Sequence, residues 1–530
     1  MSLNPVTGAE VAPVSRRLAA AAMIVIAATA ASRGFGYVRE IAAAAYFGVG
    51  REKSAFDVAF LVPNTIQILV SQAALSAALI PVFAGLLETG KREEAWLVAR
   101  TVLTLMILVL GALVVLVMAF APEIMIIFAP GYRHDPVMMS SIVHMSRLLF
   151  PTVVILAITG VVISVLNSFD HFTLPAVAPI AWNLVIVLAI VLAAGRYGID
   201  AMAWGVLLGT MVQLIIQLPG LKGRNGRLGW SLAWRNPHVR KVGALMLPVS
   251  LSIGLINFNQ VVDVQFASFL GNGGVAAMNY AFRLYQLPES LFAIAVGTVL
   301  FPTLSRMAAR NRRDDFRSML ALGLRMIFFV LIPASAFLLI MAEPLVRLAY
   351  QHGAFGGNDT SVVASALFFF ALGSAFSGGS TLLTRGFFSL SRPWIPTILA
   401  VANLGINALL DWLFIKPFGL GGIPLSTSVV SALTFFVLLF LMRRELTRIS
   451  GSELLGSAAR VTVLSMLAIS IGYLIWLGVD HQIGRAVVAQ ILSIAVSLAA
   501  TSALFMGLAW MMKMPELKLL ATLRKREKRA

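Results

Sequence analysis

Four arginines lie inside long apolar segments of this chain. Arg33 and Arg39 interrupt the first segment, Arg147 the fourth and Arg283 the eighth. A charged side chain at mid-membrane costs about 2.5–3.5 kcal/mol on insertion scales, so such residues normally face a polar cavity. The forked donors of a guanidinium group match two phosphate oxygens at once. The arginines therefore predict a carrier for a negatively charged substrate that bears phosphate.

Position along the helices predicts that these charges lie in the outer half of the membrane. At about 1.5 Å per residue, Arg33 is about 22 Å along a helix that starts near residue 18, and Arg283 is about 12 Å along one that starts near residue 275. Asp57 and Arg147 reach a similar level. The alternative for each arginine is an interfacial side chain, or one that pairs with Glu40 or Asp57.

A second set of polar residues offers oxygen ligands. Asn407 and Asp411 are spaced so that they share one face of a helix. Asp263 lies near the outer end of another helix, and Thr427 lies one turn beyond the backbone of Ile423. Carboxylate, amide, hydroxyl and carbonyl oxygens suit a hard cation, and Na⁺ is the coupling ion expected in a transporter. The alternative is that the carboxylates end helices at the interface. No resident cofactor is expected.

The elements that carry these residues are long apolar runs. Of the 530 residues, 59% are hydrophobic and 12% are charged, and the mean hydropathy is +0.90. Soluble proteins have about 25% charged residues, so this composition is typical of an all-α polytopic membrane protein. Fourteen runs are long enough to cross a hydrocarbon core of about 30 Å. They lie at 18–45, 56–87, 95–121, 138–166, 174–194, 199–219, 242–270, 275–307, 318–341, 360–389, 393–413, 422–442, 458–478 and 486–511.

Basic residues predict the orientation of the chain. The N-terminal segment, the even-numbered gaps between runs and the C-terminal tail are rich in lysine and arginine. The odd-numbered gaps hold only Arg51, Lys53, Arg133, Arg196, Arg347, Lys416 and Arg485. By the positive-inside rule, both termini are expected in the cytoplasm.

The chain also resembles itself at an offset of about 220 residues. The stretch 78–100 resembles 299–320, with Pro81 matching Pro302, and 121–131 resembles 342–353. Parallel repeats predict two six-helix lobes with a central cavity between them, and two extra C-terminal helices lie outside the repeat. The expected organisation is a cytoplasmic N-terminal segment (1–17), an N-lobe (18–219), a basic linker (220–241), a C-lobe (242–442), the last two helices (443–511) and a basic tail (512–530).

Other classes of function are disfavoured. The net charge of +18 is spread over short loops without interleaved aromatic residues, so no nucleic-acid partner is expected. The absence of cysteine excludes disulfides and cysteine nucleophiles. The six histidines lack the spacing of metal ligands, and the chain has no nucleotide-binding loop. We therefore expect a transporter and not an enzyme.

Short motifs resemble those of a known family. The stretch 32–40 (SRGFGYVRE), the stretch 59–64 (AFLVPN), the stretch 266–270 (FASFL) and Arg283 with Leu284 resemble the MurJ (MviN) lipid II flippase family of the MOP exporter superfamily. The resemblance covers nearly the whole chain. It implies a bacterial inner-membrane protein that moves lipid II, the undecaprenyl-diphosphate-linked disaccharide-pentapeptide, from the cytoplasmic to the outer leaflet for peptidoglycan synthesis.

The resemblance also implies roles for particular residues. Arginines that match Arg33, Arg39 and Arg283 line the family's central cavity, and the expected substrate site includes the adjacent Ser32 and Glu40. The sodium site of some members maps onto Asp263, Asn407, Asp411, Ile423 and Thr427. The groove beside the last two helices is expected to hold the lipid tail. Membrane lipids and proteins of cell-wall synthesis or division are the other expected partners.

The chain departs from the family pattern in the second run. Ser54 stands where many members have an acidic residue, and Gln67 and Ile68 stand where they have a further cavity arginine. Asp57 and Arg147 are the candidates to replace these charges. The rival functions are export of another polyprenyl-linked oligosaccharide, cation-coupled drug export, a membrane scaffold for cell-wall enzymes, and glycosyl transfer.

Overall fold

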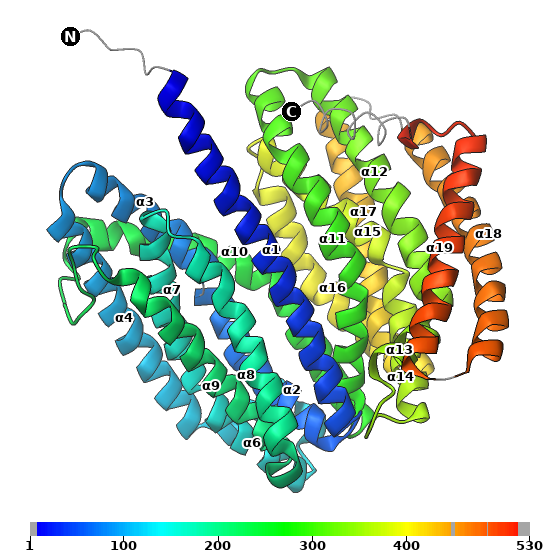
Figure 1. Ribbon diagram of the computed structural model, residues 1–530, viewed down its shortest axis with the longest axis horizontal. Helices are drawn as coiled ribbons and strands as arrows, with labels where there is room; N and C mark the ends of the chain where they lie inside the picture. The colour runs from blue at the N-terminus through cyan, green and yellow to red at the C-terminus, as the bar shows by residue number, and fades with distance from the viewer. Residues whose placement is uncertain (1–7, 71, 447–450, 485, 518–530) are drawn as a thin grey trace. The chain divides into compact units, whose positions relative to one another are not determined.

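The computed structural model describes residues 8–70, 72–446, 451–484 and 486–517, and within these ranges the chain forms helices and no strands. Its contacts divide the chain into two compact units, Met1–Gln265 and Phe266–Ala530. Figure 1 shows the helices of each unit as elongated rods that pack side by side. This architecture confirms the predicted all-α membrane fold.

The first unit contains ten helices and two short 3₁₀ turns among the described residues. They are α1 (Gly8–Phe47), α2 (Arg51–Val70), α3 (Gln72–Glu88), α4 (Arg92–Ala119), α5 (Ala121–Phe128), η1 (Pro130–Tyr132), α6 (Pro136–Leu149), α7 (Pro151–Ser168), α8 (Thr173–Tyr197), α9 (Asp200–Gln217), η2 (Leu218–Leu221) and α10 (Pro237–Ala267). The last of these, α10, continues to the boundary with the second unit.

The elements of the second unit are η3 (Ser268–Leu270), α11 (Gly274–Ala309), α12 (Arg313–Ile340), α13 (Ala342–Tyr350), α14 (Gly357–Ala371), α15 (Ser374–Ser389), α16 (Trp394–Phe418), η4 (Gly419–Gly421), α17 (Gly422–Leu446), α18 (Gly451–Ile483) and α19 (Val487–Met511). From α12 to α17 the helices of the second unit repeat the order of α4 to α9 in the first, and a hairpin follows. The helices α18 and α19 pack against each other and against α12, beyond the part that repeats.

The backbone confirms the internal repeat. A short helix follows a long one in both units, as α5 after α4 and α13 after α12. Gly198 (φ 56°, ψ −140°) ends α8, and Gly419 (φ 54°, ψ −130°) ends α16 at the matching position. Asp170 and Ser391 both have a φ of 57° in the turns that precede these two helices. A positive φ is unfavourable for residues that carry a Cβ atom, so its recurrence at matched positions reflects a shared turn geometry.

A helix or a broken pair of helices lies at each of the fourteen apolar runs. By length and composition, eight helical stretches among the described residues are suited to cross a membrane. There are nine if α14 and α15, which are bent by 43° at their junction, form one span. The count of fourteen spans stays a prediction.

Each unit has its own apolar core. In the first unit, Phe83 on α3 and Trp96 on α4 meet edge to face at 5.7 Å, and Phe169 after α7 lies 5.8 Å from Phe83. In the second unit, Phe328 on α12 and Phe435 on α17 meet at 5.3 Å inside a cluster that also includes α11 and α15. These clusters bury apolar area between helices that are themselves largely apolar.

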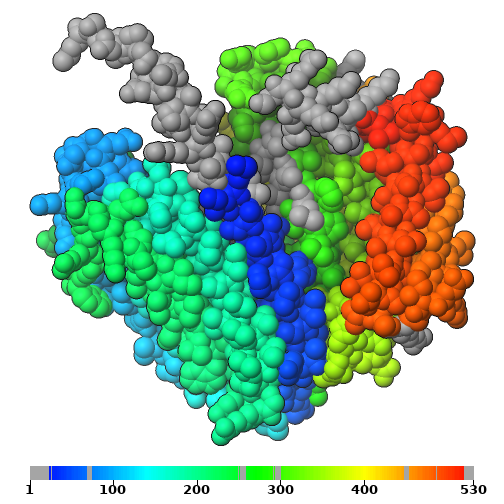
Figure 2. All heavy atoms as spheres, in the orientation of Figure 1, coloured from blue at the N-terminus to red at the C-terminus, as the bar shows by residue number. Residues whose placement is uncertain are grey.

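The outward surface of the helices is also apolar. Leu192 on α8 is 79% exposed, and Leu474 on α18 and Trp510 on α19 are 65% and 75% exposed. Figure 2 shows the outer surface of α18 and α19, in orange to red, on which these exposed side chains of the hairpin lie. Large apolar side chains that are exposed on several helices suit contact with lipid and not with water.

The segment predicted as a basic linker is packed against the first unit. Thr101 on α4 donates to the Ser231 hydroxyl at 3.0 Å, and the backbone amide of Ser231 donates to the Thr104 hydroxyl at 3.0 Å. The Arg224 guanidinium lies 5.0 Å from the ring centroid of Phe169. The division by contacts assigns α10 through Gln265 to the first unit, whereas the sequence analysis places it at the start of the C-lobe. The predicted lobe boundaries stay a prediction.

Polar contacts hold the α18–α19 hairpin at both of its ends. At one end, Arg347 on α13 donates to Asp480 at 2.6 Å and to Gln490 at 3.2 Å, and its guanidinium lies 5.4 Å from the ring centroid of Trp476. At the other end, Arg325 on α12 donates to the buried Glu516 at 2.7 Å and 2.8 Å, with Ser457 as a further donor to the same oxygen at 2.7 Å. The hairpin is therefore fixed to the rest of the second unit.

Candidate functional site

Arg39 is the buried centre of the candidate substrate site in the first unit. Its side chain is only 10% exposed. Nη1 donates to Oδ1 of Asn183 at 3.2 Å, Nη2 donates to Oε1 of Glu40 at 2.7 Å, and the guanidinium lies 4.9 Å from the ring centroid of Trp182. The buried Nε has no hydrogen-bond partner among the described residues. Its neighbours thus fix the plane of the fork and leave the Nε donor unused.

Close packing of α8 on α9 positions Asn183 and Trp182. A Cβ atom on Gly205 would lie 2.8 Å from that of Ala189, and one on Gly209 would lie 2.9 Å from the backbone oxygen of Trp182. Only glycine at these positions lets the two backbones approach so closely, as small residues four apart do in membrane helix pairs. The Trp182 indole then donates to the Thr210 hydroxyl at 3.2 Å.

Asn183 also connects α8 to the start of the family-like motif on α1. Its Nδ2 donates to the Ser32 carbonyl oxygen at 3.4 Å and to the Pro179 carbonyl oxygen at 3.0 Å. Arg33 is exposed, and none of the described residues forms an ion pair or hydrogen bond with it. Asn183 therefore joins Ser32 to Arg39, Glu40 pairs with Arg39, and the Arg33 side chain is exposed.

Arg147 and Asp57 have other partners than those predicted. Arg147 is exposed on α6, and its Nε donates to the Met118 carbonyl oxygen at 3.2 Å, one residue before the end of α4. A cation at the carboxyl end of a helix is favoured by the helix dipole. Asp57 accepts from Nζ of Lys53 at 2.5 Å. These contacts do not decide whether Arg147 or Asp57 binds substrate, and that role stays a prediction.

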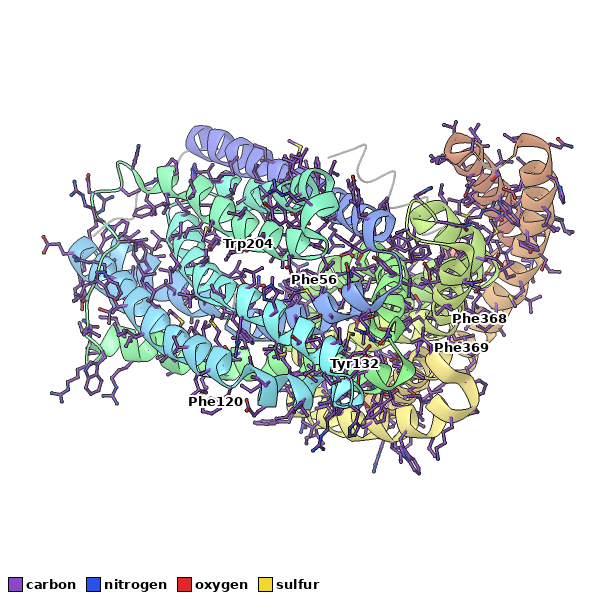
Figure 3. The ribbon with its side chains drawn as sticks, turned by 90° about the horizontal axis from the view of Figure 1, so that it is seen from below. Phe56, Phe120, Tyr132, Trp204, Phe368 and Phe369 are labelled. Atoms are coloured by element: carbon purple, nitrogen blue, oxygen red, sulfur yellow. The ribbon has the colours of Figure 1, made fainter. Side chains whose placement is uncertain are left out.

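Lys53 is a buried residue that sequence reasoning assigned to a loop. It lies within α2, one turn before Asp57, and its side chain is 2% exposed. Its ammonium group is 5.8 Å from the ring centroid of Phe56, which Figure 3 labels together with Tyr132. The signal for a buried ion pair was the spacing of opposite charges four residues apart. The loop assignment of Lys53 was wrong because the helix starts at Arg51.

Tyr132 on η1 joins the same cluster. Burial, together with the carboxylates of Asp57 and Asp135, raises its pKa to about 12, and a hydrogen bond with Ser54 acts in the opposite direction. Arg51 donates to Asp135 at 2.7 Å nearby. The cluster thus joins the start of α2 to the turn before α6, which are packed against each other. Ser54, which belongs to this cluster, stands at the position where the family pattern has an acidic residue.

In the second unit, Arg283 lies half-buried on α11. The aromatic rings of Phe282 and Tyr285 beside it pack against Phe370 of α14 at 5.6 Å and 5.3 Å. These contacts fix the face of α11 on either side of the arginine. Arg283 belongs to the second unit and Arg39 to the first, and the surroundings of each arginine are those within its own unit.

Four of the five predicted sodium ligands also lie in the second unit. Asp411 and Asn407 are buried on α16, and Nδ2 of Asn407 donates to Oδ2 of Asp411 at 3.2 Å. The Thr427 hydroxyl donates to the buried Ile423 carbonyl oxygen at 3.3 Å on α17, which packs against α16. Asp263 is buried in the first unit. No cluster of three or more histidine, cysteine, aspartate or glutamate side chains occurs in the described part of the chain.

These donors suit sodium more than a transition metal. A carboxylate, an amide, a hydroxyl and a backbone carbonyl offer oxygen atoms only, which is the set that a hard cation prefers. Burial of Asp411 favours occupation by a cation, since an isolated carboxylate is costly away from water. The chemistry of the donors therefore fits the predicted ion.

The long apolar helices, the internal repeat and the buried arginine on α1 define a multi-pass membrane transporter. Comparison with known proteins identifies its kind. The sequence model of the family described as lipid II flippase MurJ matches residues 43–484. The chain belongs to this family.

Individual relatives agree with the family assignment. The chain is 29% identical over 494 residues to the lipid II flippase MurJ of Burkholderia cenocepacia, covering 91% of this chain and 95% of the relative. It is 30% identical over 422 residues to the probable lipid II flippase MurJ of Rhizobium meliloti, covering 78% of each. The similarity thus covers most of the length of both relatives.

Solved structures show the same fold. One is a lipid II flippase MurJ in an inward closed conformation, with a TM-score of 0.77, 23% identity and coverage of 92% of this chain and 99% of that chain. Another is an inward-facing multidrug resistance transporter of the MATE family and the MOP superfamily, with a TM-score of 0.65, 15% identity and coverage of 78% and 95%. The two matches show that this chain shares the fold of these two transporters.

Proposed function

We propose that this chain moves lipid II from the cytoplasmic to the outer leaflet of the bacterial inner membrane by alternating access, with both termini in the cytoplasm. Membership of the flippase family and the activity for which its relatives are named support lipid II as the substrate. The observation in this chain that carries the proposal is Arg39, a buried guanidinium on α1 whose Nε–H has no hydrogen-bond partner among the described residues. Such a group suits an anion with several oxygens, as a diphosphate is.

The arginines have distinct roles in this proposal. Arg39 is held in one orientation, so its fork is ready to bind a diphosphate without loss of side-chain freedom. Arg33 is exposed and able to follow the head group, while Arg283 contributes the third positive charge from the second unit. Glu40 and Ser32 act through their neighbours, Glu40 by pairing with Arg39 and Ser32 by its bond with Asn183. Asp57 and Arg147 remain candidates for the charges that other members carry in the second run.

Resetting of the empty transporter requires a source of energy. A cation at Asp263, Asn407, Asp411, Ile423 and Thr427 would supply positive charge to a buried carboxylate set. The membrane potential is the other source, worth about 2.3 kcal/mol per charge per 100 mV. Exchange of external sodium at constant potential separates these two contributions.

The lipid tail is proposed to stay outside the polar site. Segment 443–511 contains α18 and α19, whose exposed side chains are apolar, which suits a polyprenyl chain. The basic segment 512–530 is proposed to contact anionic lipids of the inner leaflet; residues 447–450, 485 and 518–530 lie outside the described ones. Proteins of cell-wall synthesis or division remain proposed partners.

The decisive experiment is complementation of bacteria depleted of their own lipid II flippase. The parent chain is expected to restore growth, and Arg39→Ala and Arg283→Ala variants at matched membrane levels are expected to fail. Arg147→Ala tests the proposed compensating charge in the same assay. Failure of a well-expressed parent would favour export of another polyprenyl-linked oligosaccharide. Rescue by the parent and both variants would retain the function and reject the arginine mechanism.

A further inference from the structure

A carboxyl group in the middle of α11, the helix at the predicted membrane span 275–307, has no part in the mechanism above. Glu289 lies about 22 Å from the start of α11, a helix of 36 residues, and close to its centre. Ionisable residues at this depth are costly, and they mark ion or proton pathways in many transporters. Glu289 follows Pro288, which removes a backbone donor from the helix at this point.

The partners of Glu289 are neutral hydroxyl groups. Ser377 on α15 donates to its Oε1 at 2.7 Å, and Tyr285, one turn earlier on α11, is hydrogen-bonded to the same carboxyl group. Tyr285 is buried, and Glu289 is half-buried. Two hydroxyl donors orient a carboxylate but do not neutralise it. A neutral carboxylic acid accepts the same two bonds, so the site accommodates both protonation states.

The charged groups on the surrounding helices lie elsewhere. The titratable or charged residues of α12, α14 and α15, which pack against α11, are Arg313, Asp314, Asp315, Arg317, Arg325, Asp359 and Arg385. The first four lie within the first two turns of α12, Arg325 pairs with Glu516, and Asp359 bonds the backbone at the start of α14. Arg385 is two turns beyond Ser377 on α15. Among the described residues none of these forms an ion pair with Glu289.

Arg283 is the nearest charged residue along α11. Six residues separate it from Glu289, which is about 9 Å along the helix axis. A negative charge at Glu289 therefore opposes the binding of an anionic head group at Arg283, and its neutralisation removes that opposition. Because the coupling of two binding events is reciprocal, a bound head group also favours the protonated state of Glu289.

We propose that Glu289 is a proton-binding site that titrates during transport, and that its protonation favours the anionic substrate at Arg283. The carboxylate takes one proton from water to become a neutral acid, and it returns that proton when the substrate leaves. Only an O–H bond forms and breaks. This inference rests on the proposed function, since it assumes that the substrate is an anion bound near Arg283.

Lipid II binding to the full chain in nanodiscs, measured between pH 5 and pH 8 at constant sodium, tests the proposal. The parent is expected to bind more weakly as the pH rises, by up to about twentyfold for one unit charge about 9 Å away at an effective dielectric constant of about 20. Glu289→Gln is expected to keep the tight binding of the low-pH parent at every pH. Glu343→Gln, the same change at an exposed carboxylate of α13, is expected to behave as the parent.

Two further variants and a spectrum separate the outcomes. Ser377→Ala is expected to move the midpoint of the pH dependence while leaving the transition in place, which a merely structural role of Ser377 would not do. Infrared difference spectra between the two pH limits are expected to contain a carboxyl band that Glu289→Gln lacks, and this readout needs no substrate. An unchanged band in Glu289→Gln, or a pH response equal to that of the parent, would overturn the proposal. A response to sodium at fixed pH that Glu289→Gln abolishes would replace the proton by sodium. Absence of lipid II binding by the parent at every pH would count against the proposed function instead.

Discussion

Replacing Asn183 by alanine removes the acceptor that orients Arg39. The bond from Nη1 is 3.2 Å long, which is longer than the usual 2.7–2.9 Å or so of a charge-assisted hydrogen bond. We therefore take the lower end of the range of about 1.5–3 kcal/mol for hydrogen bonds to charged groups. About 1.5 kcal/mol corresponds to roughly a tenfold change in an equilibrium constant. Lipid II affinity is expected to fall by up to that factor, because Glu40 and Trp182 still hold the guanidinium.

Lipid II binding to the purified Asn183→Ala variant, beside a thermal unfolding curve, measures this effect. Asn403→Ala is the matched control, since Asn403 lies on α16, the counterpart of α8, and donates to the Thr434 hydroxyl at 2.9 Å without contacting an arginine. The control is expected to lose stability but to keep the affinity of the parent. Equal affinity of Asn183→Ala and the parent, or an equal loss in both variants, would refute the role assigned to Asn183.

Three other predictions follow from the same structure. Arg39→Lys keeps the charge but loses the fork and the stacking, so complementation is expected to fail at expression levels equal to the parent's, and normal growth would contradict the bidentate role. Gly209→Ala is expected to destabilise the fold by about 1–3 kcal/mol, since its Cβ atom would lie 2.9 Å from the backbone oxygen of Trp182. Thermal unfolding measures this loss. The control is Gly195→Ala, whose Cβ atom would meet nothing within 4 Å and which therefore reports the general effect of alanine in a helix. Burial raises the pKa of Glu516, but hydrogen bonds and the Arg325 guanidinium outweigh burial and hold that pKa below its ordinary value of 4.5. The ionised carboxylate therefore stabilises the fold above about pH 4.5, and this stabilisation is lost as the pH falls through the lowered pKa. Unfolding curves at several pH values are expected to lose this acid-dependent part in Glu516→Gln, and an unchanged pH dependence would contradict the assignment.

The helices and the repeat were predictable because they depend on local patterns. Apolar length alone locates a membrane helix, since the bilayer requires every backbone group to be bonded within its own segment. The repeat was visible in the sequence as matched proline and charge positions near Pro81 and Pro302. Breaks such as the one between α14 and α15 were missed, because a bent pair and a straight helix have the same composition.

The contacts of the site were less accessible from the sequence. The arginines were conspicuous because charge is rare in apolar runs, but nothing local marked Asn183 as the partner of Arg39, which lies on another helix. Lys53 was misplaced because hydropathy averages over a window and a buried ion pair resembles the end of a run. Glu289 was overlooked for a similar reason, since its hydroxyl partner Ser377 is distant in the sequence.

The packing of the long basic segment against the first unit has a practical consequence for protein engineering. Such a segment is where one would insert a tag, a fluorescent protein or a protease site, because exposed loops tolerate added chain. Here Ser231 is bonded to two threonines of α4, and a Cβ atom on Gly226 would overlap the Trp96 ring. An insertion between Gly226 and Ser231 would disturb the core of the first unit and not merely lengthen a connection. The chain passes from the first unit to the second near the end of α10, so an insertion into the basic segment would lengthen a part of the first unit and not the connection between the units.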